Sequence, residues 1–228
     1  MRITSTVIMF AFLGGILPAL FWLWFWQRED RSHPEPRGLI LLSFLVGILA
    51  VFMVLPIEMW INNRVTNITI LIALWAFVEE MGKYLAAKFA ILRRKDVDEP
   101  NDPLMYLITV ALGFSALENT LFLLGPLTQG QTSLTIITGN MRFIGATLLH
   151  IASSATIGTA LALSFYKNKI HKRLFLIVGV ILSVALHTIF NFLIMRSGGG
   201  NIFMTFAGVW VIILTLLLIF EKVKRVHP

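Results

Sequence analysis

Seven long apolar runs dominate this sequence, and each is close to the length that a helix needs to cross a bilayer. About 20 apolar residues form a helix that spans the roughly 30 Å of a membrane's hydrocarbon core. Composition agrees, because 57% of the residues are hydrophobic and only 14% are charged. We therefore expect an all-α fold, a polytopic transmembrane bundle of about seven helices, over residues 5–26, 38–60, 67–91, 103–124, 143–165, 174–195 and 202–220.

Short polar connections separate these runs, so the 228 residues leave no room for a separate soluble domain. We predict a single integral-membrane domain over residues 1–228. The segment 128–141 fits this scheme less well, because its apolar stretch is too short to cross a membrane and is bounded by Gly130 and Gly139. We interpret it as an external loop or a re-entrant segment.

The basic residues are divided unevenly between alternate connections. Of the 19 Lys and Arg residues, fourteen lie at the end of or after the first, third, fifth and seventh runs, four lie on the opposite side, and Lys83 lies in the middle of a run. Because cytoplasmic loops of membrane proteins are enriched in Lys and Arg, we expect the N-terminus outside and the C-terminus in the cytoplasm. The net charge of +7 then indicates contact with anionic lipid, not with nucleic acid. The absence of cysteine excludes disulfides and thiol chemistry.

Polar residues inside the apolar runs are the candidates for function. A charge at bilayer depth is costly, so such side chains usually face a polar interior and act there. Counted along each run, Glu79 and Glu80 fall near the midplane, and Glu118, His150 and His187 fall a few ångström towards the outer face, which indicates a cavity in the outer half of the membrane. We expect them to converge on one water-accessible cavity. These residues are Glu79, Glu80, Lys83, Glu118, Asn119, His150, His187 and Asn191.

The spacing of these residues suggests how they pair. Glu79 and Lys83 are four residues apart and share a helix face, and Glu80 is three residues from the same lysine. His187 and Asn191 are also four apart. A structural role, as a neutralised cluster or as hydrogen bonds between helices, stays open for each residue taken singly.

In this order the motifs resemble one known family. Glu79-Glu80-x-x-Lys83, Phe114-x-x-x-Glu118-Asn119, His150 and His187-x-x-x-Asn191 are similar to the motifs of PrsW-type intramembrane proteases, bacterial enzymes that degrade anti-sigma factors. The resemblance covers nearly the whole chain. The CAAX prenyl proteases and bacteriocin-immunity proteins of the wider clan match less well, because their first motif has its cation where this chain has Tyr84, and their second has His in place of Glu118.

The resemblance implies a multi-pass protein of the bacterial cell membrane that hydrolyses a peptide bond in a single-pass, anti-sigma-factor-like substrate. Glu80 or Glu79 would take a proton from water, His150 and His187 would orient that water or protonate the leaving amine, and Asn191 would donate to the oxyanion. We expect the cut in the extracytoplasmic juxtamembrane region of the substrate, and no cofactor. The alternative is a zinc peptidase whose metal ligands are Glu118, His150 and His187.

Two classes without proteolytic activity also bury such residues. A proton-coupled transporter would do so, although we find no internal repeat of the kind that many transporters show. A membrane sensor would do so as well, and would tolerate amides in place of the glutamates.

Overall fold

The computed structural model describes residues 4–31, 34–196 and 202–223, and within these ranges the chain folds into helices without strands. The elements are α1 (Ser5–Glu29), α2 (Arg37–Asn62), α3 (Ile68–Ala90), α4 (Asp102–Thr128), α5 (Thr132–Met141), the π-helical turn η1 (Arg142–Ala146), α6 (Thr147–Leu163), α7 (Lys169–Arg196) and α8 (Ile202–Val223). The predicted all-α bundle is confirmed.

Six helical segments among the described residues are long and apolar enough to cross a membrane. They are α1, α2, α4, the continuous segment α5–η1–α6, α7 and α8. Helix α3 is also long enough, with 23 residues, but it carries four charged residues. For this reason it is not among the helices that are apolar enough to cross a membrane by composition alone. The chain is a polytopic membrane protein, and the orientation of its termini stays a prediction.

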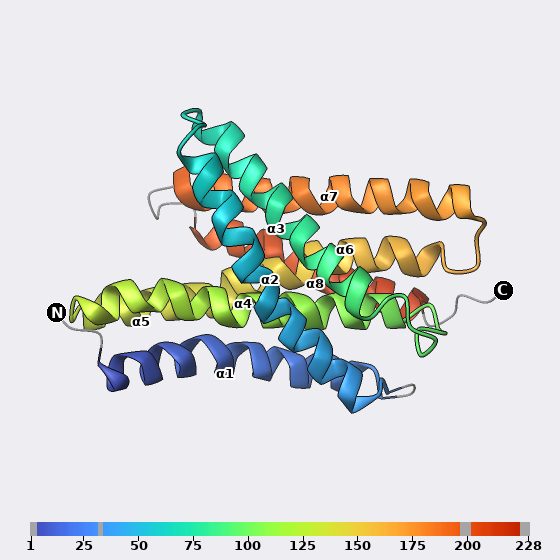
Figure 1. The fold of residues 1–228 in the computed structure, drawn as a ribbon, viewed down its shortest axis with the longest axis horizontal. Coiled ribbons are helices and arrows are strands. Elements are labelled where there is room, and N and C mark those ends of the chain that lie inside the picture. Colours follow the sequence, from blue (N-terminus) through green and yellow to red (C-terminus); the bar gives the residue numbers. More distant parts are fainter. Residues whose placement is uncertain (1–3, 32–33, 197–201, 224–228) are drawn as a thin grey trace.

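Helix α4 lies at the centre of the bundle. It is buried along most of its length, and it packs against α1, α2 and α6. Figure 1 shows α1, α4, α6, α7 and α8 running along the long axis of the molecule, whereas α2 and α3 cross them obliquely. This oblique pair brings the second half of α2 and the middle of α3 over the face formed by α4, α6 and α7.

Two glycines set how closely α2 and α4 approach each other. A Cβ atom on Gly47 of α2 would lie 2.1 Å from the carbonyl oxygen of Val110, and one on Gly113 of α4 would lie 1.9 Å from that of Phe44. Any larger residue would have to push the helix backbones apart. The crossing therefore fixes where the second half of α2 stands relative to the candidate site.

The segment 128–141 differs from our expectation of a loop or re-entrant piece. Residues Thr132–Met141 form α5, which continues through η1 into α6 as one helical segment that ends at Leu163. Gly130 does separate α4 from α5, since it has a positive φ of 68° in the turn after α4. Gly139 does not, because it keeps a helical backbone. A glycine inside a helix weakens it without ending it, which is why the sequence pattern was misleading here.

A buried polar cluster joins the α1–α2 connection to the start of α4. The Tyr106 hydroxyl donates to Glu35, and the Asn101 amide donates to Asp30. Asp102 accepts hydrogen bonds of 2.8 and 2.9 Å from the backbone N–H groups of residues 98 and 99. Burial raises the pKa of Glu35 from its usual 4.5 to about 8, and nearby Asp102 and Asp30 act in the same direction.

We expect this cluster to make the stability of the protein depend on pH. Because the folded state binds the Glu35 proton more tightly than the unfolded state, the stabilisation is complete below about pH 4.5 and is lost as the pH rises towards 8. Thermal unfolding in detergent should therefore show a midpoint that falls across this window. Glu35→Gln, which still accepts from Tyr106, should flatten the profile. Parallel profiles for the variant and the wild type would contradict the assignment.

Candidate active site

Helix α3 brings its two glutamates and its lysine into the interior of the bundle. The helix begins after Asn67, whose side-chain oxygen caps it by accepting from the N–H groups of Thr69 and Ile70 at 3.0 and 3.1 Å. Three turns further on, Glu79 is 6% exposed, while Glu80 and Lys83 are completely buried. Charged groups at zero exposure need partners, and neighbouring helices supply them.

Glu80 is surrounded by hydrogen-bond donors. Its Oε1 lies 2.6 Å from Lys83 Nζ, 2.8 Å from the Ser153 hydroxyl and 2.7 Å from Nδ1 of His187. Its Oε2 accepts from the Ser154 hydroxyl at 3.1 Å. Glu80 is thus a fully buried carboxylate that links α3, α6 and α7 through four donors.

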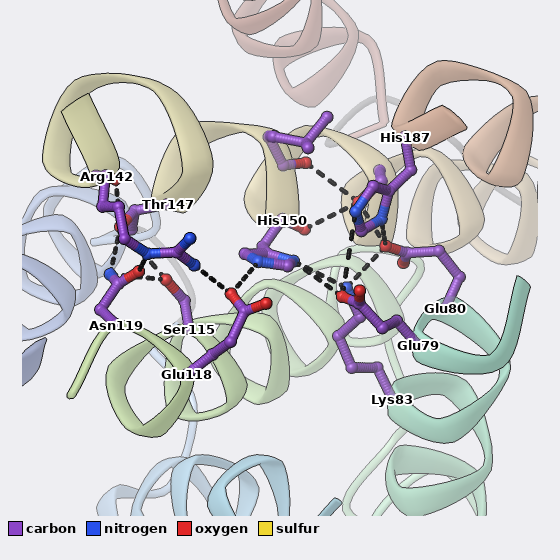
Figure 2. Close-up of polar contacts among 12 residues, drawn as sticks. Glu79, Glu80, Lys83, Ser115, Glu118, Asn119, Arg142, Thr147, His150 and His187 are labelled. Atoms are coloured by element: carbon purple, nitrogen blue, oxygen red, sulfur yellow. Dashed lines mark hydrogen bonds and ion pairs between the residues drawn. The ribbon is translucent and has the colours of Figure 1, made fainter. Parts of the chain in front are cut away.

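The two histidines are arranged in the same way. His187 of α7 has Nδ1 against Glu80, and His150 of α6 has Nε2 at 2.8 Å from Glu118 Oε2. A carboxylate accepts hydrogen bonds, so these two ring nitrogens carry the protons. The other nitrogen of each ring then carries a lone pair, and both of these nitrogens lie on the side of Glu79 (Figure 2). That of His150 also faces Lys83 Nζ at 3.1 Å.

Glu79 completes a group of three possible ligands. Its Oε2 lies 3.8 Å from Nδ1 of His150 and 3.8 Å from Nε2 of His187. This oxygen is buried and has no hydrogen-bond partner among the described residues. One ligand atom from each of the three residues lies within 4.8 Å of the others. Two imidazoles and a carboxylate match a catalytic zinc shell, and the carboxylates behind both rings match the outer shell of metal-bound histidines.

Sequence reasoning assigned Glu118, not Glu79, to this set of metal ligands. In the structure Glu118 lies behind His150, bonded to its Nε2, and Arg142 Nη2 donates to the same carboxylate. Glu79 takes the position between the rings. The difference arises because Glu118 meets only one histidine, and helical spacing does not say on which side of an imidazole a carboxylate will lie.

The group of three opens into a pocket of about 680 Å³ between α2, α3, α4, α6 and α7. Glu79, Glu118, His150, His187 and Asn191 all line it. Its walls are otherwise largely apolar, with residues such as Val54, Trp75, Phe114, Leu121, Phe122, Ile194 and Met195. Five of the eight residues that were predicted to converge on a cavity therefore line this pocket.

Glu80, Lys83 and Asn119 are not part of the pocket lining. Lys83 connects two of the site's elements, since its Nζ lies 2.6 Å from Glu80 and 3.1 Å from Nδ1 of His150. Asn119 donates to Ser115 and Thr147 at 3.2 and 3.0 Å and accepts from Arg142. These three residues hold the groups that reach the pocket.

Sequence reasoning missed Arg142, Ser153 and Ser154. The serines follow His150 by three and four residues, so they share its helix face, and that spacing could have identified them. Arg142 had only been counted among the loop charges. Its position eight residues before His150 carried no signal, because Arg142 begins a π-helical turn, which changes the helical register before His150.

Comparison with known proteins agrees with this geometry. The family model of PrsW family intramembrane metalloproteases matches residues 35–219. The chain is 28% identical to Protease PrsW of Geobacillus kaustophilus and 27% identical to that of Clostridioides difficile, in each case over 81% of this chain and 79% of the relative. It is 30% identical to Protease PrsW of Bacillus subtilis over 51% of this chain and 56% of that protein. No solved structure matches the chain.

The match covers most of the chain and includes every helix that contributes to the pocket. The predicted family, and with it the prediction of a protease, are confirmed. This multi-pass bacterial membrane protein belongs to the PrsW family of intramembrane proteases.

Proposed function

We propose that the chain is a zinc-dependent intramembrane endopeptidase, with Glu79, His150 and His187 as the metal ligands. The observation that carries this proposal is the meeting of Glu79 Oε2, His150 Nδ1 and His187 Nε2 at the pocket, with a carboxylate behind each ring. Zinc in such a site supplies a water that is activated near neutral pH and a Lewis acid for the scissile carbonyl.

The chain's own residues then have separate tasks. Glu80 and Glu118 hold the two imidazoles in one tautomer each. Asn191 lines the pocket one turn from His187, where its amide could donate to the oxyanion that develops on the substrate. The apolar walls would surround the side chains of an extended peptide and exclude bulk water.

A metal-free mechanism is the second candidate, and one contact favours it. Lys83 Nζ lies 3.1 Å from His150 Nδ1, the nitrogen that a metal would use. In this mechanism Glu79, whose Oε2 has no hydrogen-bond partner among the described residues, takes a proton from water held between the two rings. Glu79 is central to both mechanisms.

Removal of metal separates the two candidates. We expect the purified protein to contain about one zinc per chain, to lose cleavage of a reporter substrate on treatment with phenanthroline, and to regain it when zinc is added back. The non-chelating isomer of phenanthroline is the matched control. Full activity in a preparation that elemental analysis shows to be free of metal would refute the zinc proposal and leave the metal-free one.

We further propose that the substrate is a single-pass membrane protein of the anti-sigma-factor type, cut near its extracytoplasmic membrane boundary. The pocket lies towards the end of the bundle where α2 ends and α3 begins, and the distribution of basic residues predicts that this end faces the outside. The termini of products from a tagged single-pass reporter, determined by mass spectrometry, locate the cut. A cut on the cytoplasmic flank would contradict this proposal without affecting the metal assignment.

A further inference from the structure

Arg142 lies in the π-helical turn between α5 and α6, and α4 holds it from three positions. Its guanidinium donates to Glu118 and to the side-chain oxygen of Asn119, and it stacks 3.9 Å from the ring centre of Phe122. The side chain is only 15% exposed. A guanidinium with planar donors can satisfy two acceptors at once, which an ammonium group does poorly.

The turn itself is built into the same network. The Thr147 hydroxyl donates to the Arg142 carbonyl at 3.0 Å, and it accepts from Ser115 and Asn119 at 3.1 and 3.0 Å. Figure 2 shows these groups on one side of His150 and the Glu79–Glu80–Lys83 group on the other. π-Helical turns inside α-helices are frequent at functional sites. Here the turn directs a cation towards a carboxylate of the pocket.

Each histidine is thus supported by a carboxylate, and each carboxylate is in turn held by a cation. His187 is followed by Glu80 and then by Lys83. His150 is followed by Glu118 and then by Arg142. In each case a cation holds the carboxylate that fixes the protonated nitrogen of the ring. The two series differ in that Lys83 is fully buried and also contacts His150, whereas Arg142 reaches its histidine only through Glu118.

We propose that Arg142 is a positioning residue that acts through Glu118 to keep the proton of His150 on Nε2, so that the lone pair stays on Nδ1, on the side of Glu79. This inference rests on the proposed function, because it assigns a purpose to that lone pair. Without the guanidinium, Glu118 would be free to turn away from the ring. The imidazole could then rotate or change tautomer, and the group of three ligands would lose one member.

The test is a double-mutant cycle on metal affinity, made with Arg142→Gln, Glu118→Gln and the double variant. Zinc affinity of the detergent-solubilised protein is measured by chelator competition, without substrate. We expect Arg142→Gln to weaken binding by about 10- to 100-fold, as losses of outer-shell groups do. If Arg142 acts through Glu118, the double variant should be no weaker than Glu118→Gln alone. Additive losses would overturn the proposal.

Arg64→Gln is the matched control, because Arg64 also stacks on an aromatic ring, 4.4 Å from the centre of Trp60, but contacts no residue of the group of three. Arg142→Lys should give an intermediate affinity. If Arg142→Gln is not recovered folded, the cycle is made with Arg142→Lys, Glu118→Gln and the double variant of these two. Wild-type affinity in folded Arg142→Gln or in Arg142→Lys would show a purely structural role and refute the inference.

Zinc binding by the wild type tests the proposed function, and the ratios of zinc affinity between the variants test this inference. If the wild type binds no zinc, the same cycle is read on reporter cleavage, where loss of Arg142 should lower kcat and leave KM unchanged. A change in KM alone would contradict positioning of His150.

Discussion

Glu79→Gln is expected to reduce cleavage of a membrane-anchored reporter by at least about 10²–10⁴-fold, the range typical for the loss of a group that moves a proton. The reason is that Glu79 Oε2 faces both free ring nitrogens at 3.8 Å. Glutamine has nearly the same shape but offers a neutral amide, which binds a divalent cation poorly and does not take a proton from water. The effect should appear in kcat, measured on purified protein in detergent.

The same variant should remain folded, because no hydrogen bond to Glu79 Oε2 from a described residue is lost. Thermal unfolding checks this point. Glu99→Gln is the control, since Glu99 lies in the connection before α4, at the other end of the bundle from the pocket. Turnover by Glu79→Gln within a few-fold of wild type would exclude both mechanisms proposed above.

Lys83→Met should destabilise the folded protein by about 3–5 kcal/mol, the usual cost of removing one partner from a buried ion pair. Lys83 and Glu80 are both 0% exposed, and Nζ lies 2.6 Å from Oε1. Methionine has a similar length but leaves the Glu80 carboxylate without its cation. The expected result is a large fall in the free energy of unfolding, measured by denaturant titration in mixed micelles.

A second substitution tests the cause. Glu80→Gln in the Lys83→Met background removes the isolated charge, so it should recover part of the lost stability. Lys88→Met is the matched control, because Lys88 lies in the last turn of the same helix. Equal losses for Lys83→Met and Lys88→Met would show that the buried pair does not hold α3 in place.

Much of this molecule could be predicted from the order of its residues. Runs of about 20 apolar residues force backbone hydrogen bonds to form within each segment, so an all-helical bundle follows from composition and length. The cost of charge in hydrocarbon likewise marked Glu79, Glu80, Lys83, His150 and His187 as a group. The structure brings all five into contact.

Helical spacing determines which residues share a face, but it leaves open what that face meets. The rotation of each helix about its own axis is decided by packing, as at the crossing of α2 and α4, where Gly47 and Gly113 admit backbone contact. For this reason only the tertiary structure shows that Glu79 rather than Glu118 stands between the histidines, and that Asn119 binds Arg142 instead of lining the pocket. It also shows that residues 132–141 continue a helix, because Gly139 keeps a helical backbone.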